Sequence, residues 1–581
     1  MGTLGFILPA LAGDAAGATQ TITVDFGVTD EPVSHRASGT LYGITADGST
    51  PADAWIEPMN PVLFGGGGAR LSGGGWANGG QSGYDTRWNM VENHYNRVTQ
   101  PNIDAEYFIK FNDLWGADSV TVTGDDPFPG DNGDWSSYES FVQQIVSDIN
   151  AAGMDRSVIQ YEIWNEPDLD MFWPRSTTQY YEMWERGVNL IQSLDPNARI
   201  NGPGVTHYER SVIEDWLDMT ITTGTEPDIL NWHDLQTGDD AVDAANEIRG
   251  LLADRGLTDV SLQINEYVPA NNQSPGYTAW DLCRVEKSGV KWASLANWDY
   301  CCDGGALAGT LTEDGTQPTG RWWLYCRYGQ MTGDMVPTAR SSNIDSIANL
   351  NPPSTQSRII VGNNGTTGDI DVTLQNVDQI SSNKIRVKVE RSPELSPLSA
   401  PEVAQDYVTN VSGSDHTVGL SWNRATDAYV ITVTQASAPI ADGVYRIEAT
   451  HSGKVADVNQ SSTSDGATVH QWEWLGGDNQ RWIATNVRDN VYTFENVNSG
   501  KFLDVDEISM ANGADVHQWT GTGAANQEWY VEETANGEYR LEAVHSGKVL
   551  DVAGGLTSDG ANVHQWIDRS ESQQRWQFIA A

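Results

Sequence analysis

Two glutamates in the N-terminal half of the chain each follow a short apolar run that ends abruptly in turn-forming residues. Glu166 comes after the run Val158–Trp164, and Glu266 comes after Val260–Ile264. β-Branched and aromatic runs that end in this way are typical of buried strands. At the C-terminal ends of the parallel strands of a (β/α)8 barrel, side chains converge on one pocket, and two carboxylates there are what hydrolysis of a glycosidic bond requires. We therefore predict a catalytic pair; the alternative is two solvated turn glutamates.

The segments around these glutamates alternate between strand-like and helix-like patterns, which predicts an α/β fold with a parallel sheet closed into a (β/α)8 barrel. The two carboxylates then lie at the ends of the fourth and seventh strands. A further strand at 20–27 is expected to leave the barrel for another domain. The eight expected barrel strands are 40–44, 69–71, 119–122, 158–164, 198–201, 228–232, 260–264 and 292–298.

The residues around the two glutamates form recognisable motifs. Trp-Asn-Glu-Pro, residues 164–167, ends the fourth strand, and Asn-Glu-Tyr, residues 265–267, ends the seventh. The pair resembles the motifs of clan A retaining glycoside hydrolases, most closely the family 39 β-xylosidase group, over residues 20 to 435. The resemblance implies Glu166 as acid/base and Glu266 as nucleophile. The substrate-binding residues that it implies are Arg70, Trp164, Asn165, His233, Tyr267 and Trp298.

In a retaining mechanism one carboxylate attacks the anomeric carbon, while the other first protonates the leaving oxygen and then activates water. Asn165 would bond the sugar 2-hydroxyl, Arg70 and His233 would orient the nucleophile, and Trp298 would be a stacking platform. Each role has a structural alternative: a tie between loops for Arg70 and Asn165, a buried barrel histidine for His233, and a core tryptophan for Trp298. The Gly-rich loop 65–83 departs from the family pattern, so the resemblance does not specify which sugar is the substrate.

The C-terminal part of the chain contains three copies of one pattern at a spacing of 47 residues. Val-His-Gln-Trp recurs with its tryptophan at 472, 519 and 566, and a closing tryptophan recurs at 482, 529 and 576. Three strand-like copies predict a threefold β-trefoil. The closing segments resemble the Gln-x-Trp signature of ricin-B-type lectins and family 13 carbohydrate-binding modules.

The lectin resemblance implies three sugar sites, in which an aromatic face takes the C–H groups of a sugar while Asp and Asn bond adjacent hydroxyls. The Gln residues of the signature are also expected to pack in the core, and the third site has Gln573 where the pattern has Asn. The implied residues are Asp457, His470, Trp472, Asn479 and Gln480 in the first site, Asp504, His517, Trp519, Asn526 and Gln527 in the second, and Asp551, His564, Trp566, Gln573 and Gln574 in the third.

Between the barrel and the repeats, Asn349–Pro353 marks a boundary, and the alternating runs after it predict a β-sandwich. The expected architecture is therefore multidomain. Its bounds are 1–18 for a signal-like or disordered tail, 19–348 for the catalytic (β/α)8 barrel, 349–436 for the β-sandwich, to which strand 20–27 is a candidate addition, and 437–581 for the ricin-B-like β-trefoil.

Residues 1–18 combine a short apolar run with small residues and resemble the h-region and cleavage site of a signal peptide, although the basic n-region is missing. We therefore expect a secreted, extracellular protein; the alternative is a disordered tail. No other segment approaches the ~20 apolar residues of a membrane span.

The net charge of −46 arises from 79 acidic and 33 basic residues, and only 8 of the basic residues are Lys. Such a surface repels nucleic acid and anionic membranes, so the expected partner is a polysaccharide or oligosaccharide, with no nucleic acid and no membrane. Scattered acid with scarce Lys also favours a halophilic source, because high ionic strength screens the self-repulsion. No cofactor is expected.

Four cysteines, at positions 283, 301, 302 and 326, lie within 44 positions of each other. In a secreted chain this clustering favours one or two disulfides, with three pairings open. No His joins them at metal-ligand spacing, so no metal is expected there.

Together these patterns predict a secreted retaining glycoside hydrolase that acts on a plant or microbial polysaccharide, with xylosidase-like exo action favoured, and that is anchored by a lectin module. One alternative is an endo-acting hydrolase of galactan, arabinan or an exopolysaccharide. Another is a non-catalytic lectin with an inactive barrel.

Overall fold

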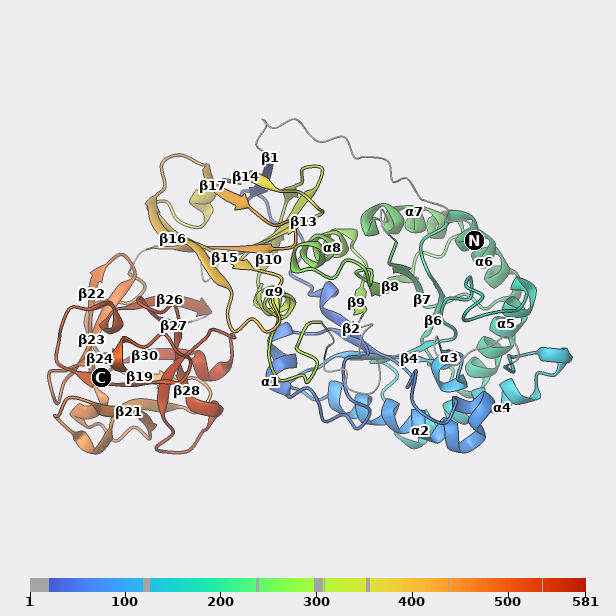
Figure 1. The fold of residues 1–581 in the computed structure, drawn as a ribbon, viewed down its shortest axis with the longest axis horizontal. Helices are drawn as coiled ribbons and strands as arrows, with labels where there is room; N and C mark the ends of the chain where they lie inside the picture. Colours follow the sequence, from blue (N-terminus) through green and yellow to red (C-terminus); the bar gives the residue numbers. More distant parts are fainter. Residues whose placement is uncertain are drawn as a thin grey trace, which may run out of the picture.

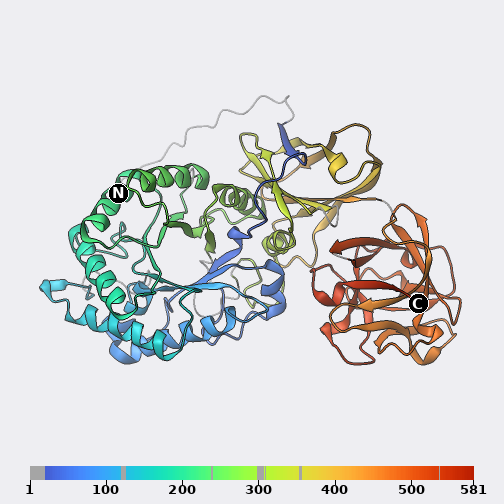
Figure 2. The same ribbon diagram turned by 180° about the vertical axis from the view of Figure 1, so that it is seen from behind.

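The structure is a computed structural model that describes residues 20–118, 126–236, 240–296, 307, 309–351, 356–436, 438–535 and 537–581. Figures 1 and 2 show a helix-ringed barrel at one end of the molecule and a trefoil at the other, with a β-sandwich against the barrel between them. The predicted combination of barrel, sandwich and trefoil is confirmed.

The barrel is a closed sheet of eight parallel strands in the order β2 to β9. Its strands are buried along their whole length apart from a few end residues, because helices cover the outside of the sheet and side chains fill the inside. The strands are β2 (Gly39–Leu41), β3 (Leu63–Gly65), β4 (Glu106–Lys110), β5 (Ile159–Glu162), β6 (Ile200–Val205), β7 (Ile229–Asp234), β8 (Ser261–Tyr267) and β9 (Trp292–Ala296). The helices are α1 (Asp53–Ile56), α2 (Gly75–Val98), α3 (Phe111–Trp115), α4 (Ser136–Ala151), α5 (Thr177–Leu194), α6 (Arg210–Thr223), α7 (Ala241–Asp254), α8 (Pro275–Ser288) and α9 (Gly320–Gly329).

Two barrel strands differ from the sequence prediction. The second strand is β3, which precedes the Gly-rich loop, whereas residues 69–71 form a turn beyond it. The third strand is β4, whereas the predicted strand 119–122 lies outside the described residues. The prediction overlooked β3 because it has only three residues. A side chain at Gly65 would strike the ring of Phe108 on β4, so a glycine ends that strand.

The β-sandwich consists of two sheets, with strand orders β11-β1-β14-β17 and β10-β12-β13-β18-β15-β16. Its first strand is the expected stray strand, β1, which pairs in parallel with β14. The sandwich also includes β10, β11 and β12, which begin before residue 349. It therefore begins earlier than the expected bound. Its strands are β1 (Gln20–Asp25), β10 (Asp334–Val336), β11 (Thr338–Ala339), β12 (Ile344–Leu350), β13 (Gln356–Asn363), β14 (Gly368–Gln375), β15 (Lys384–Ser392), β16 (Glu402–Asn410), β17 (His416–Trp422) and β18 (Ala428–Gln435).

The trefoil is built from twelve short strands around one core, which the closing tryptophans Trp482, Trp529 and Trp576 fill without any exposure. Each indole nitrogen donates to a backbone carbonyl of the same repeat, at 2.9 to 3.2 Å. The strands are β19 (Gly443–Ala449), β20 (Lys454–Val458), β21 (Ala467–Trp472), β22 (Trp482–Arg488), β23 (Val491–Asn496), β24 (Phe502–Val505), β25 (Ala514–Trp519), β26 (Trp529–Ala535), β27 (Glu538–Ala543), β28 (Val549–Val552), β29 (Val563–Trp566) and β30 (Trp576–Ala580).

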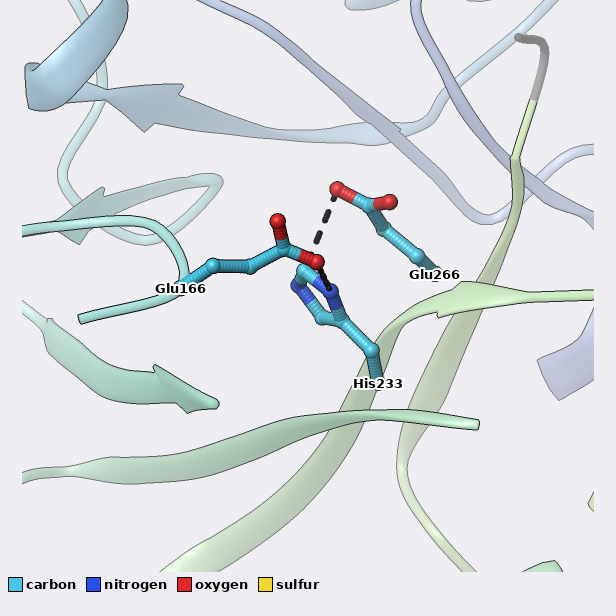
Figure 3. Close-up of side chains that lie close together, drawn as sticks. All are labelled: Glu166, His233 and Glu266. Atoms are coloured by element: carbon cyan, nitrogen blue, oxygen red, sulfur yellow. Dashed lines mark hydrogen bonds and ion pairs between the residues drawn. The ribbon is translucent and has the colours of Figure 1, made fainter. Parts of the chain in front are cut away.

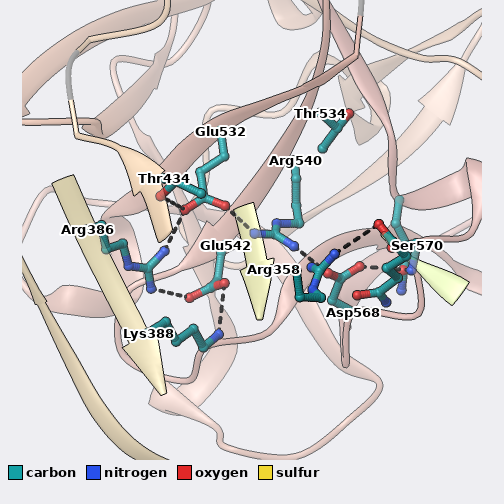
Figure 4. A network of polar contacts seen from close by, with 12 residues as sticks. Arg358, Arg386, Lys388, Thr434, Glu532, Thr534, Arg540, Glu542, Asp568 and Ser570 are labelled. Carbon is teal, nitrogen blue, oxygen red and sulfur yellow. Dashed lines mark hydrogen bonds and ion pairs between the residues drawn. The ribbon is translucent and has the colours of Figure 1, made fainter. Parts of the chain in front are cut away.

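A buried network of ion pairs joins the sandwich to the trefoil (Figure 4). Arg386 of β15 donates to Glu532 at 2.8 Å and to Glu542 at 2.7 Å, and Lys388 reaches the same Glu542 at 3.1 Å. Arg540 continues the chain of contacts from Glu532 to Asp568. Buried charges of this kind are tolerated only when each is paired, so the network fixes how the two domains meet.

The two cysteines that the structure describes do not form the predicted disulfide. Cys283 on α8 and Cys326 on α9 are buried free thiols, and burial raises the pKa of both. Both side chains lie in the barrel's hydrophobic core, where a thiol packs as a small apolar group. Cys301 and Cys302 lie outside the described residues.

In the part of the chain that the structure describes, the helices are too short or too polar for any of them to cross a membrane.

Candidate active site

Local distortions of the backbone bring both glutamates into the mouth of the barrel. Glu166 lies four residues beyond β5 and has a positive φ of 47°. Its amide donates to the carbonyl of Gly204 at 2.7 Å, and Gly204 itself has a φ of 73° and no room for a side chain beside Trp164. On the other side, β8 carries one extra residue opposite β7, so that His233 pairs with Glu266. Bulges and left-handed residues of this kind re-aim side chains next to active sites.

Glu166, His233 and Glu266 converge on one point (Figure 3). His233 Nδ1 lies 3.0 Å from Glu166 Oε1, and His233 Nε2 lies 3.6 Å from Glu266 Oε1. One nitrogen or oxygen from each side chain lies within 4.8 Å of the other two, and all three residues are buried. Burial alone would lower the pKa of His233, but the carboxylates of Glu266 and Glu166 outweigh it and raise that pKa. The histidine thus lies between two carboxyl groups that favour its protonated form.

Lys110, at the end of β4, is a central residue that the sequence analysis missed. Its Nζ donates to Asn165 Oδ1 at 2.7 Å and to Glu266 Oε1 at 3.0 Å. Burial alone would lower the pKa of Lys110, but the carboxylates of Glu162 and Glu266 outweigh it and raise that pKa. With Oε1 bonded to Lys110, Glu266 Oε2 is left buried without a partner among the described residues. One oxygen of Glu266 is therefore anchored, and the other is available for chemistry.

Glu162 adds a third carboxylate below this pair. It is fully buried at the end of β5, and burial, offset in part by Lys110 and His233, raises its pKa to about 7. Asn231 on β7 approaches its Oε1 at 3.5 Å. The signal for Lys110 and Glu162 was present in the sequence: each is a charged residue inside an aromatic and apolar run, and Lys is scarce in this chain. The run 107–109 had been assigned to no strand.

The other predicted substrate-binding residues do not all face the site. Asn165 lies at its centre, where its Oδ1 accepts from Lys110. Trp164 has no exposure and packs on Phe128 and Trp173, so it shapes the turn before Glu166 and is not a sugar platform. Tyr267 points outward: its buried hydroxyl donates to Ala37 O and bonds Tyr325. A strand alternates its faces, so the residue after Glu266 leaves the pocket.

Arg70 is half-buried in the Gly-rich loop with a φ of 64°, and its amide donates to Asp118 at 3.0 Å. Lys110 makes the contact to Glu266 that had been expected of Arg70. Trp298 lies outside the described residues.

The cluster of Glu166, His233 and Glu266 offers three ligand atoms and could by its spacing hold a metal ion. The ammonium of Lys110 already bonds Glu266 Oε1, and a second cation at the same oxygen would be repelled. The arrangement is therefore interpreted as two carboxylates balanced by two side-chain cations.

The trefoil repeats its predicted sugar site three times with the same internal geometry. In each repeat the Asp and His lie opposite one another on paired strands, and His Nε2 contacts Asp Oδ1 at 3.1, 2.9 and 2.9 Å. The same His stacks on the Trp two residues later, with ring centroids 5.3 or 5.4 Å apart. Asp457, Asp504 and Asp551 are thus fixed beside an aromatic face, as the lectin prediction required.

The amides around these sites differ. Asn479 donates to Asp457 at 2.9 Å and Asn526 donates to Val505 O, whereas Gln573 donates to Glu571. The signature glutamines are buried and brace the loop: Gln480 and Gln574 donate to backbone carbonyls, and Gln527 donates to Asp504 and to Thr520 O. The lectin resemblance implied that these three glutamines bind sugar, but their side-chain amides already hydrogen-bond within the trefoil.

Comparisons with known proteins agree with this geometry. Residues 428–519 and 525–581 match the family described as ricin-type beta-trefoil lectin domain-like. A 3-O-alpha-D-galactosyl-alpha-L-arabinofuranosidase of Bifidobacterium longum subsp. longum is 25% identical over 407 residues, which cover 60% of this chain and 33% of the relative. A 3-O-beta-L-arabinopyranosyl-alpha-L-arabinofuranosidase of Bifidobacterium pseudocatenulatum is 22% identical over 547 residues, which cover 81% of this chain and 53% of the relative. The chain thus spans about a third to a half of these relatives.

Among solved structures, the protein N2152 from Neocallimastix frontalis superposes with a TM-score of 0.60 at 24% identity, over 72% of this chain and 100% of that one. The GH39 enzyme from Xanthomonas axonopodis pv. citri superposes with a TM-score of 0.51 at 14% identity, over 74% and 99%. At these identities the likeness concerns the fold. The predicted resemblance to family 39-type glycoside hydrolases carrying a ricin-type trefoil is confirmed at that level.

Proposed function

We propose that this protein is a retaining glycoside hydrolase in which Glu266 is the nucleophile and Glu166 the acid/base. The observation that carries the proposal is the approach of the two carboxylates, whose nearest oxygens lie within 4.8 Å. Retaining enzymes hold their carboxyl groups about 5 to 5.5 Å apart, whereas inverting enzymes need about 6.5 to 9.5 Å for an intervening water. The short separation supports direct attack on the sugar.

The surroundings of each carboxylate support its role. Lys110 and His233 face Glu266 Oε1, so the nucleophile is oriented while its free Oε2 attacks the anomeric carbon. His233 Nδ1 bonds Glu166 Oε1, which leaves the other oxygen of Glu166 for the leaving group and later for water. Asn165, held by Lys110, is set to bond a sugar hydroxyl as charge develops.

The substrate that the relatives favour is an α-L-arabinofuranoside, with a further glycosyl unit at its 3-position as in the names of both arabinofuranosidases. A second candidate is a β-xyloside. It is favoured by the β-xylosidase of Geobacillus stearothermophilus, which is 22% identical over 156 residues. Both candidates are neutral pentosides, which suits a chain with a net charge of −46 better than an anionic glycan does.

The trefoil would hold the enzyme on its polymer. Binding there raises the local concentration of substrate at the barrel without any contact to the reacting sugar. Because polymeric glycans do not cross membranes, we further propose an extracellular site of action. For the acidic surface we propose salt adaptation, in which high ionic strength screens the repulsion among its carboxylates.

The test is hydrolysis of aryl α-L-arabinofuranoside and aryl β-xyloside, with the anomer of the first product followed by NMR. Retention of configuration is expected, together with a clear preference for one of the two glycosides. Release of the inverted anomer would refute the double displacement, and no hydrolysis of either glycoside, nor of arabinan, galactan or xylan, would favour a binding protein.

A further inference from the structure

The third sugar site of the trefoil has a wall that the second site lacks. Its pocket, of about 470 Å³, is lined by the repeat's own Asp551, His564 and Trp566 and also by Ala54 and Glu57 of the barrel. The barrel residues come from α1 and from the turn Glu57–Met59 that follows it. The second site, by contrast, is a pocket of about 340 Å³ lined only by trefoil residues. The third site is therefore larger and lies in the seam between two domains.

The sequence of the third repeat differs where it faces the barrel. The second repeat has Glu507 and Ile508 on the rim of its site, and the first has Gln460 and Ser461, whereas the third has glycines at 554 and 555. All six residues have a positive φ, between 52° and 65°. The backbone conformation is thus the same in all three repeats, and what the glycines change is the space that the missing side chains leave in the pocket.

Two charged residues occupy the opposite rim. Arg569 and Glu571 stand where the second repeat has Thr522 and Ala524. The Arg569 guanidinium lies 4.3 Å from the ring centroid of Trp55 on the barrel and 6.0 Å from that of Trp566. It therefore joins the aromatic face of the sugar site to an aromatic residue of the other domain.

Carboxylates from both domains face this pocket. Burial raises the pKa of Glu571 to about 7; Arg569 opposes that rise, and the nearby carboxylates Asp551 and Glu57 add to it. Glu57 is held from behind by Asn102, whose amide donates to its Oε1 at 2.6 Å. A ligand here meets acceptors for its hydroxyl groups on two sides, and a negatively charged ligand meets repulsion.

From these contacts we propose that the third repeat and the barrel together form a composite site for a neutral oligosaccharide of at least two residues. One sugar unit stacks on Trp566 and bonds Asp551, and the next unit lies between Arg569 and Glu57. The trefoil is held beside the barrel by the stacking of Arg569 on Trp55, and buried ion pairs tie it to the sandwich. The proposal rests on carbohydrate binding by the trefoil, which is part of the proposed function, and does not depend on hydrolysis.

The test uses the full chain with Glu266→Gln, so that bound sugar is not consumed. Asp457→Ala and Asp504→Ala together leave the third as the only intact trefoil site. Titration calorimetry then measures the binding of arabinotriose, xylotriose, arabinose, xylose and trigalacturonate, and the same chain with Asp551→Ala added gives the part bound in the barrel, which is subtracted. We expect a neutral trisaccharide to bind at least tenfold more tightly than its monosaccharide, and trigalacturonate not to bind. Adding Glu57→Ala should weaken trisaccharide binding about fivefold to tenfold and leave monosaccharide binding within twofold.

A matched control carries Asp457→Ala and Asp551→Ala, which leave only the open second site; there Glu57→Ala should change nothing. Glu57→Gln, which keeps the shape of the side chain, guards against a local folding defect. Loss of all binding with only the third site intact, or binding that ignores Glu57, would overturn the composite site. A parent chain that binds these sugars but hydrolyses none would refute the glycosidase and leave the composite site standing.

Discussion

The barrel centre and the trefoil sites position their carboxylate side chains in opposite ways. Lys110 and Glu266 are 156 residues apart in sequence and meet only because β4 and β8 close into one barrel. In each trefoil site, the Asp and His are 13 residues apart and lie on neighbouring strands of one hairpin. The first arrangement needs the whole domain, whereas the second needs a single repeat.

The two arrangements also differ in how they balance charge. At the barrel centre three buried carboxyl groups lie around Lys110 and His233, so removal of one group changes the balance of charge for the others. In the open trefoil sites the Asp is paired locally with His, near the surface. The comparison teaches that substitutions at the barrel centre should have large and coupled effects, and substitutions in the trefoil small and separable ones.

The largest expected effect follows from Glu266→Gln. Removing the attacking oxygen should lower kcat by at least about 10³-fold, because this group acts on the reacting carbon itself. Sugar binding by the trefoil, measured by calorimetry, should be unchanged. Turnover by the variant within tenfold of the parent would mean that another residue attacks.

Glu166→Ala distinguishes the acid/base from the nucleophile. Azide should restore the turnover of activated aryl glycosides by this variant, because it replaces the missing base.

A smaller loss is expected for Lys110→Met, which removes the cation but keeps the length of the side chain. Glu266 and Glu162 would then lie buried without it, so kcat should fall about 10²-fold and the melting temperature should drop. Lys110→Arg, the conservative control, should recover part of both. If Lys110→Met lowered the melting temperature but left kcat and its pH profile alone, the lysine would be a structural residue only.

The interface between sandwich and trefoil offers an intermediate case, with buried charges but no catalysis. Arg386→Met should destabilise the interface by about 3 kcal/mol, because it leaves Glu532 and Glu542 short of a partner. Differential scanning calorimetry should then resolve a separate, earlier transition of the trefoil, while hydrolysis of small aryl glycosides stays as in the parent. Arg340→Met, at a pair that is 43% and 21% exposed, is the control and should cost little.

The same interface should respond to acid. Burial alone would raise the pKa of Glu542, but Arg386 and Lys388 outweigh it and lower the value to about 2. A carboxyl whose pKa is lowered by folding stabilises the fold above its unfolded pKa, and this contribution is lost as the pH falls through the folded value. Thermal melts should therefore show the interface weakening between about pH 4.5 and pH 2. A pH-independent transition there would contradict the network.

The smallest effect is expected in the open trefoil site. Asp504→Ala should weaken the binding of neutral oligosaccharides at that site about tenfold, a loss consistent with one charged hydrogen bond, and leave hydrolysis of small substrates unchanged. On insoluble polymer the rate should fall by no more than a few fold, because two sites remain. Point substitutions test the module more cleanly than its deletion would, since deletion would remove Glu532 and Glu542, two of the buried partners of Arg386.

Several features of this protein were determined by short stretches of sequence. The two glutamate motifs, the strand-end positions of Asn165 and His233, and the threefold repeat with its Asp, His and Trp could all be predicted. Each depends on local physics: an apolar run that must be buried, a turn that must follow it, and a spacing that recurs. The strand lost to the sandwich, β1, was predictable for the same reason.

Other features were decided only when distant segments met. The prediction did not include Lys110, because strands as short as β3 and β4 show little periodicity and only the closed barrel sets their order. It assigned Tyr267 to the pocket, whereas alternation along β8 turns that ring outward. The wall that Glu57 adds to the third sugar site exists because two domains dock. Trp55 and Arg569, about 500 residues apart, become neighbours there through a contact that no local pattern encodes.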